Sequence, residues 1–264
     1  MAVADDVLRE TFDREAERYD RARPHYPAAL FADLARLTGI GPGSRVLEIG
    51  AGTGQATAGL VDLGADVLAI ELGAELATVA RRRLGRAATV VVADFDTWPL
   101  PAEPFDLVLA ATSWHWLDRT TRSARVATAL RPGGSFATIG TAHVAGGTTA
   151  FFAETQPIYE QWDPATPPGV RLQPSSEIAL QSDDIEESGL FEPSRNRRYE
   201  VDIGYSRAEY LDVLQTYSGH IALPEDARRG LLQGIGELID GSYGGSITKR
   251  YLFELRTARR ISSR

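Results

Sequence analysis

The pattern that most constrains this chain is a regular alternation of short apolar segments with longer amphipathic ones. Five apolar segments have the length and composition of buried strands: 45–49, 66–70, 89–92, 105–110 and 135–140. Three segments between them have the spacing of helices: 55–63, 74–84 and 119–130. Strands that alternate with helices of this length form right-handed βαβ units around a parallel sheet. The sequence therefore predicts a doubly wound α/β fold.

The regular alternation of expected strands and helices ends after Gly140, and further strands and helices are expected later in the chain. Two strands are predicted, at 197–203 and 246–256, and two helices, at 206–217 and 224–240. The expected architecture is a mostly parallel seven-stranded sheet, with five strands from the first half of the chain and a terminal pair from the second. The residues between 145 and 195 are expected to form a helical cap inserted between strands, with helices at 150–162 and 175–188.

Composition excludes several classes of protein. The 264 residues carry a net charge of −8 with no basic stripe, so no nucleic-acid partner is expected. The chain has no cysteine, which excludes disulfides and thiolate catalysis, and no set of His, Asp and Glu has metal-ligand spacing, so no metal is expected. There is no apolar stretch of about 18 residues and no apolar run near the N-terminus, so we expect a cytoplasmic protein with no membrane span and no signal peptide.

Three glycines, Gly50, Gly52 and Gly54, follow the first expected strand and precede a helix. Glycine allows a sharp turn and a close approach of ligand to backbone, and open α/β sheets bind ligands at the carboxyl ends of their strands. A dinucleotide-binding turn has its third glycine one place later, where this chain has Gln55. Glu48, just before the turn, would repel a pyrophosphate but suits a ligand with an ammonium or a sulfonium. A tight turn without a ligand is the plainer alternative.

Two further acids fall at the ends of the next expected strands. Glu71 lies about twenty residues past the first glycine, where a carboxylate can accept both hydroxyls of a ribose. Asp94 follows the third strand and can accept from an exocyclic amine, while Phe95 beside it can cover the face of a purine. Each acid could instead be an exposed residue at a strand end. With the glycine turn, they favour a ligand that contains a ribose and a purine.

These motifs give the chain a resemblance to a known family. Five segments are similar, in this order, to the motifs of the class I S-adenosylmethionine-dependent methyltransferases: 46–54, 69–71, 93–95, 105–108 and 130–136. Five more resemble a small-molecule branch that includes trans-aconitate methyltransferase-like proteins: 12–20, 23–27, 113–117, 217–220 and 222–224. The resemblance implies a Rossmann-like methyltransferase fold with a helical cap, and S-adenosylmethionine as the cofactor.

The resemblance also assigns residues to the cofactor. In this branch the N-terminal segment closes over the cofactor, so Tyr19 and Arg23 are expected at its methionine end, where Arg23 can pair with the carboxylate. The residues expected to contact S-adenosylmethionine are Tyr19, Arg23, Glu48, Gly50, Ala51, Gly52, Gln55, Glu71, Leu72, Asp94, Phe95 and Thr112. The corresponding segments are an N-terminal helical lid (1–37), a cofactor-binding core (38–144), a substrate cap insertion (145–195) and a C-terminal part of the same α/β domain (196–264).

Histidines are the candidate catalytic residues. Methyl transfer from a sulfonium is an in-line displacement with an activated leaving group, so the protein mainly aligns the nucleophile and excludes water. A base is needed only when the nucleophile must lose a proton. His115, after the fourth expected strand, and His25, in the N-terminal segment, are the candidates for that base, although His115 could equally be a packing residue. His220 and His143 are weaker candidates.

Aromatic side chains are the candidates for lining a substrate site. They are Trp114, Trp116, Phe151, Phe152, Tyr159 and Trp162. Such residues can form an aromatic cavity, but they can also simply pack inside a cap. For the helix expected near 151–162, packing is the slightly favoured interpretation.

The predicted function is transfer of a methyl group to oxygen or nitrogen of a small molecule, with a specialised metabolite as a further hypothesis. Three alternatives stay open. One is a non-methylating, cyclase-like member of the fold with the same cofactor, another is a dinucleotide-dependent oxidoreductase, and the third is a non-enzymatic binding or regulatory protein. The expected partner is a small-molecule substrate, with no nucleic acid and no membrane, and we expect a monomer or a homodimer.

Overall fold

The computed structural model describes residues 16–179 and 184–262, and its contacts divide the chain into two compact units. Among the described residues, the core unit consists of residues 25–141, 184–199 and 253–262. The cap unit consists of residues 16–24, 142–179 and 200–252. Three long strands have residues in both units, and the four segments expected from the sequence stay a prediction.

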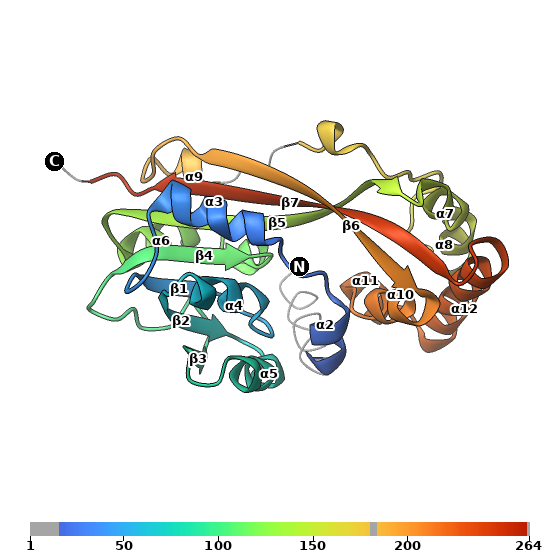
Figure 1. The fold of residues 1–264 in the computed structure, drawn as a ribbon, viewed down its shortest axis with the longest axis horizontal. Helices are drawn as coiled ribbons and strands as arrows, with labels where there is room; N and C mark the ends of the chain where they lie inside the picture. The colour runs from blue at the N-terminus through green and yellow to red at the C-terminus, as the bar shows by residue number, and fades with distance from the viewer. Residues whose placement is uncertain (1–15, 180–183, 263–264) are drawn as a thin grey trace. The chain divides into compact units, whose positions relative to one another are not determined.

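The described chain forms one seven-stranded sheet. Its strands are β1 (Arg45–Ile49), β2 (Asp66–Glu71), β3 (Ala88–Val92), β4 (Phe105–Ala111), β5 (Leu130–Gly147), β6 (Arg195–Ser206) and β7 (Ser246–Arg259). Their order in the sheet is β3-β2-β1-β4-β5-β7-β6 (Figure 1). The pairs among β1 to β5 are all parallel. The predicted doubly wound, mostly parallel sheet is confirmed, and its order reverses between β1 and β4, where such sheets bind ligands.

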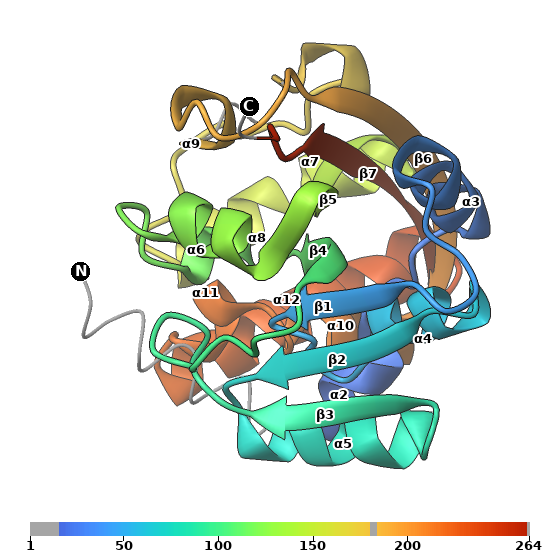
Figure 2. The same cartoon turned by 90° about the vertical axis from the view of Figure 1, so that its left-hand side faces the viewer.

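Helices of the core unit connect its strands. They are α3 (Ala28–Thr38), α4 (Gln55–Asp62), α5 (Ala74–Leu84) and α6 (Arg122–Ala129). Figure 2 shows β1, β2 and β3 side by side, with α5 running along β3. Helix α5 buries Ala77 and Ala80 against Ala69 of β2 and Val90 of β3. Small side chains at these positions let the helix approach the sheet closely.

Aromatic side chains fill the core unit beside β4 and β5. Phe105 and Phe136 are both 1% exposed. The ring of Phe136 lies 4.7 Å from that of Trp114 and 6.0 Å from that of Phe191. Truncating a buried phenylalanine to alanine typically costs about 3–5 kcal/mol. This packing therefore holds the carboxyl end of β4 in place.

The cap unit contains the ends of three strands and a set of helices. Strand β5 was expected to end at Gly140, but it continues to Gly147, and β6 and β7 also extend past their expected ends. The helices are α2 (Ala16–Ala22), α7 (Thr149–Glu154), α8 (Gln156–Trp162), α10 (Arg207–Leu214), α11 (Ser218–Ile221) and α12 (Glu225–Ser242). In the described part of the chain, none of the helices has the length and apolarity that a membrane span needs.

Two helices expected in the second half of the chain differ in the structure. The single helix expected at 150–162 is interrupted at Thr155, because Pro157 in the first turn of α8 has no N–H to continue α7. The helix expected at 175–188 is a short 3₁₀ turn, η2 (Ser175–Glu177), followed by a single turn, α9 (Asp184–Glu187); residues 180–183 lie outside the described residues.

Glycines explain how α8 packs against α12. A Cβ added to Gly230 would lie 2.5 Å from the ring of Trp162, and one added to Gly234 would lie 2.9 Å from Ile158. The two glycines are four residues apart and therefore lie on one face of α12. Trp162 is thus a packing residue of the cap unit, as the favoured interpretation of this segment expected.

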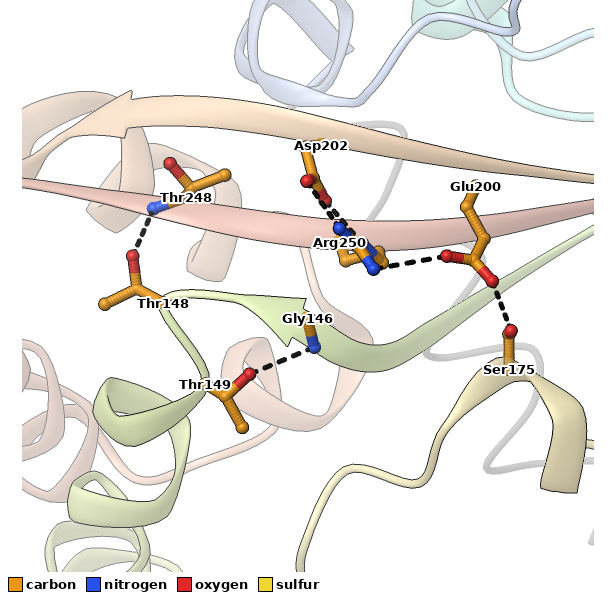
Figure 3. Close-up of polar contacts among 8 residues, drawn as sticks. All are labelled: Gly146, Thr148, Thr149, Ser175, Glu200, Asp202, Thr248 and Arg250. Carbon is orange, nitrogen blue, oxygen red and sulfur yellow. Dashed lines mark hydrogen bonds and ion pairs between the residues drawn. The ribbon is translucent and has the colours of Figure 1, made fainter.

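Polar contacts join the strands of the cap unit to the loops beside them (Figure 3). The Arg250 guanidinium on β7 donates to both carboxylate oxygens of Asp202 on β6, at 2.6 and 2.7 Å. It also reaches Glu200, whose other oxygen accepts from the Ser175 hydroxyl of η2. The backbone N–H of Thr248 donates to the Thr148 hydroxyl at 2.9 Å. These bonds hold β7, β6 and η2 together within the cap unit.

Candidate ligand-binding site at the end of the first strand

The glycine turn after β1 requires glycine for more than one reason. Gly50, Gly52 and Gly54 have φ values of 69°, 58° and 82°, which disfavour other residues. A Cβ on Gly50 would lie 2.5 Å from the Cβ of Ser113, and one on Gly54 would lie 2.9 Å from Leu84. A Cβ on Gly52 would meet nothing within 4 Å. The outer glycines are therefore needed for packing, whereas the middle one faces open space that a ligand can use.

Glu48 is a buried acid without a cationic partner in the described part of the chain. Its side chain is 1% exposed, and neither carboxyl oxygen makes a hydrogen bond there. The pKa of Glu48 is raised to about 8, mainly by burial; the neighbouring Thr57 hydroxyl offsets part of this effect, and the Glu71 carboxylate adds to it. A positively charged group placed near Glu48 would relieve this cost.

Glu71 ties the glycine turn to the end of β2. Its two oxygens accept from the backbone N–H groups of Gly52 at 2.7 Å and of Gly73 at 2.8 Å. The side chain is 7% exposed. Carboxylate oxygens have further lone pairs, so Glu71 can hold the turn and still accept from a ligand hydroxyl.

Apolar side chains are unusually exposed beside Glu71. Leu72, which follows β2, is 46% exposed, and Val92 at the end of β3 is 42% exposed. Val92 is paired in register with Glu71, so the two positions are neighbours across the parallel strands. Gln55 begins α4, and Ala51 in the turn is buried. The carboxyl edge of β2 and β3 thus offers an acid next to apolar surface.

Asp94 and Phe95 are placed differently from each other. Asp94 is exposed, and its Oδ1 accepts from the backbone N–H of Asp96 at 3.0 Å. Phe95 is only 2% exposed, in the main hydrophobic core, with the Arg125 guanidinium 5.2 Å from its ring. Any contact of Phe95 with a ligand would therefore have to come mainly from its backbone, while the Asp94 carboxylate lies at the surface.

Thr112 has the one positive φ, 56°, among the described residues other than glycine. A β-branched residue in this conformation is strained, and strain of this kind is concentrated at functional sites. Its backbone N–H donates to Ile139 at 2.8 Å, and its hydroxyl lies 3.1 Å from that of Tyr26. Next to it, the Ser113 hydroxyl donates to the Ile49 carbonyl at 2.5 Å. The end of β4 is therefore bound to the end of β1, beside the glycine turn.

The two predicted catalytic histidines lie in the core unit and are exposed. His115 belongs to a 3₁₀ turn, η1 (Trp114–Trp116), and its ring lies 4.7 Å from that of Trp116. His25 lies just before α3. Their exposure leaves both rings available to a substrate, and their catalytic roles stay predictions.

Tyr19 and Arg23 lie in the cap unit. The Arg23 guanidinium is 4.9 Å from the ring of Tyr19 and 4.7 Å from the ring of Tyr217, and it donates to the Thr216 carbonyl at 2.8 Å. Its Nε is buried and makes no hydrogen bond in the described part of the chain. The expected contact with the methionine end of a cofactor stays a prediction.

Sequence reasoning did not find two features. Ser113 and Tyr26 fasten the loop after β4; both lie in segments that resemble the small-molecule branch, 113–117 and 23–27, but the sequence assigned neither of them a role. A group of cationic side chains around Lys249 gathers in the cap unit; the sign in the sequence was that Lys249 is the chain's single lysine. Across the part of the chain that is described, no three His, Asp or Glu side chains are grouped as metal ligands would be.

Comparison with known proteins relates part of the chain to methyltransferases. Residues 47–138 match the family described as "Methyltransferase domain". An uncharacterized methyltransferase of Mycobacterium tuberculosis is 36% identical over 124 residues, 47% of this chain and 49% of that protein. A protein-L-isoaspartate O-methyltransferase of Methylorubrum populi is 42% identical over 96 residues, 35% of this chain and 43% of that protein. The chain thus spans about half the length, or less, of these curated relatives.

Solved structures show the same fold over most of the chain. A protein of Anaeromyxobacter dehalogenans, provisionally assigned as a type II methyltransferase, has a TM-score of 0.62 at 23% identity and covers 92% of this chain and 99% of its own. Phosphoethanolamine N-methyltransferase 2 of Haemonchus contortus has a TM-score of 0.53 at 17% identity, covering 95% of this chain and 58% of its own. At these identities the likeness shows the fold alone. Residues 47–138 match a methyltransferase domain, and both the class I assignment and the trans-aconitate branch stay predictions.

Proposed function

We propose that this protein is an S-adenosylmethionine-dependent methyltransferase that acts on oxygen or nitrogen of a small molecule. The observation that carries the proposal is Glu48, a buried acid with no cationic partner among the described residues, directly before a turn whose middle glycine faces open space. Of the common nucleoside cofactors, S-adenosylmethionine carries positive charge at its amino-acid end, whereas a dinucleotide would bring a pyrophosphate to this turn.

The residues at this edge fit the parts of that cofactor. Glu48 would stabilise the ammonium group and Glu71 would accept from the ribose hydroxyls. Leu72 and Val92 would cover the purine, with the exposed Asp94 carboxylate free to accept from its amine. When bound, the cofactor supplies a methyl group on a sulfonium, which is already activated for transfer.

The protein's own residues would align the methyl acceptor with the cofactor and remove a proton from the acceptor where one must be lost. A carboxylate or a neutral amine needs no base, but a hydroxyl or a phenol benefits from one. His115 and His25 are the residues proposed to accept that proton, since both rings are exposed on the core unit. The isoaspartate O-methyltransferase relative supports oxygen as an acceptor atom.

The proposal is tested by calorimetric titration of the whole protein with S-adenosylmethionine and, separately, with NADH. We expect micromolar binding of S-adenosylmethionine and none of NADH. Removing one charge of a buried pair should weaken binding by about 10- to 100-fold in Glu48→Gln, and Glu71→Ala should also weaken it.

Glu103→Gln is the matched control, since Glu103 is an exposed acid of the core unit that pairs only with Arg45 in the contacts described. It should bind like the unchanged protein. Preference for NADH, or no binding of S-adenosylmethionine, would overturn the proposal. Equal binding by Glu48→Gln would overturn the role of Glu48.

A further inference from the structure

The single lysine of the chain is buried in the cap unit. Lys249, on β7, is 4% exposed. Four aromatic rings surround its ammonium nitrogen at 5.3 to 5.6 Å: Phe152, Tyr210, Tyr217 and Tyr251. These rings come from α7, α10, the start of α11 and β7. An amine in such surroundings has lost most of its water, so its charge has to be compensated from elsewhere.

Other cationic or protonatable groups gather at the same place. The Lys249 nitrogen lies 3.4 Å from the Tyr217 hydroxyl, and the His143 Nε2 lies 3.2 Å from the same oxygen. The Arg23 guanidinium lies over the ring of Tyr217, 4.7 Å from its centre. The ring of His220 is 5.6 Å from the ring of Tyr217. Tyr217 is therefore the residue that all of these groups contact.

No carboxylate pairs with Lys249, His143 or Arg23 in the part of the chain that the structure describes. The charged and titratable groups that act on Lys249 and His143 are Arg23, His220 and each other, all of positive sign. Acids lie further out, with Asp163 acting on His220 and Glu209 on Tyr205. The neighbouring Arg250, by contrast, is paired with two acids. When these groups are protonated, the cluster thus has surplus positive charge in a chain of net charge −8.

The protonation of the cluster reflects this surplus. Burial, with the nearby Arg23, lowers the pKa of Lys249 to about 7. Burial and the neighbouring cations hold the pKa of His143 well below its usual value. Burial raises the pKa of Tyr217 to about 12, so its hydroxyl keeps its proton at neutral pH and can donate it in a hydrogen bond. An anion among these groups would favour their protonated forms.

We propose that Lys249, Tyr217 and His143 form an anion-binding site that takes an aromatic carboxylate. An ammonium, a phenol and an imidazole N–H together match the two oxygens of one carboxylate. The rings around them suit a flat apolar body, since aromatic pairs attract at 4.5 to 7 Å. His143, Tyr217 and Phe152 are the partly exposed members, so a ligand would approach past them. The inference goes beyond the proposed function and does not depend on it.

The single lysine allows a direct test. Protein made with lysine labelled at the ε-carbon and ζ-nitrogen gives one side-chain signal in NMR, which belongs to Lys249. We expect this signal to titrate near pH 7 in the free protein and, with saturating benzoate, to titrate at about pH 8 or above, since an opposite charge within a few ångströms favours the charged form. An unchanged titration on adding benzoate would overturn the proposal.

Variants test whether benzoate binding depends on Lys249. Lys249→Met should weaken benzoate binding by about tenfold or more, while Arg229→Met, which removes an exposed cation of the same unit, should leave it unchanged. Equal binding by Lys249→Met would overturn the site, and phosphate binding as tightly as benzoate would overturn the carboxylate assignment. Binding of S-adenosylmethionine by Lys249→Met shows that the variant is folded. If the unchanged protein failed to bind S-adenosylmethionine but bound benzoate, only the proposed function would fail.

Discussion

The core unit and the cap unit each contain a deeply buried charged-type side chain, an acid or a lysine, that has no partner of opposite charge among the described residues. In the core unit this is the acid Glu48, 1% exposed, and in the cap unit it is the base Lys249, 4% exposed. Burial raises the pKa of Glu48 to about 8 and lowers that of Lys249 to about 7, so both are held toward their neutral forms. The comparison indicates that the two units are prepared for ligand groups of opposite charge, a cation beside Glu48 and an anion beside Lys249.

The two sites differ in how they are built. Glu48 is followed within six residues by the whole glycine turn, so a short stretch of chain makes the site. Lys249 takes its neighbours from α7, α10, α11, β5 and the end of α2. The first site is therefore visible as a motif, while the second exists only after folding.

The largest expected effect is a stability that depends on pH with opposite signs for the two residues. Between pH 4.5 and 8 the folded protein holds a proton on Glu48 that the unfolded chain has lost, so this acid makes stability fall as pH rises. Between pH 7 and 10.5 the unfolded chain holds a proton that folded Lys249 has lost, so this base makes stability rise with pH. Each effect amounts to at most about 4–5 kcal/mol over its window.

Urea unfolding from pH 5 to 9 measures both slopes. The difference between the unchanged protein and Glu48→Gln should fall from pH 5 to 8, and the difference from Lys249→Met should rise from pH 7 to 9. If the two stability differences changed with pH in the same direction, or did not change, the opposite effects of Glu48 and Lys249 on stability would be contradicted.

The next largest effect is expected on the free energy of unfolding when glycines of the turn are replaced. Gly50→Ala should lower the free energy of unfolding by about 3 kcal/mol, because its Cβ would lie 2.5 Å from that of Ser113 and its φ is positive. Gly52→Ala has only the φ penalty of about 1 kcal/mol, but its Cβ would occupy the open space proposed for the cofactor.

Gly43→Ala is the control for Gly52→Ala, since Gly43 has a φ of 80° and nothing within 4 Å, in the loop before β1. Both variants should lose similar stability in urea unfolding. Only Gly52→Ala should lose binding of S-adenosylmethionine in calorimetry. Normal binding by Gly52→Ala would show that the open space is not used by the cofactor.

A smaller effect is expected at Arg250, which is ion-paired, unlike its neighbour Lys249 on β7 in the described part of the chain. Arg250→Met removes the ion pairs with Asp202 and Glu200, and we expect a urea midpoint that falls less than in Gly50→Ala, because the guanidinium is partly exposed to water. Benzoate binding should be retained. Loss of benzoate binding in Arg250→Met would mean that the site depends on the strand pairing rather than on the Lys249 charge.

The smallest effect concerns the strained residue at the end of β4. Asparagine tolerates a positive φ better than a β-branched residue does, so Thr112→Asn should gain about 0.5–1 kcal/mol of stability. Thr112→Val keeps the strain and removes the hydroxyl near Tyr26, and it should gain nothing. Thermal unfolding of the two variants distinguishes them; a gain in Thr112→Val instead would show that the hydroxyl, not the backbone, sets the stability.

Several elements were predictable because their signals are local. The five parallel strands of the core unit and the turn at Gly50 follow from periodicity and glycine spacing within short segments. The lengths of β5, β6 and β7 were underestimated, since pairing with a neighbouring strand, not composition, decides where a strand ends. The break at Pro157 was missed although proline marks it, because the apolar spacing of the segment is helical on both sides.

The sequence by itself determined the order of the strands and helices in the core, the glycine turn and the acids Glu48 and Glu71 beside it. These depend on interactions between residues close together in the chain. Only the tertiary structure decided that Lys249 is buried among aromatic rings, that Phe95 belongs to the core and that Ser113 packs on Gly50. Burial is the sum of contacts from many distant segments, and a charge acquires its unusual pKa only when those segments remove its water.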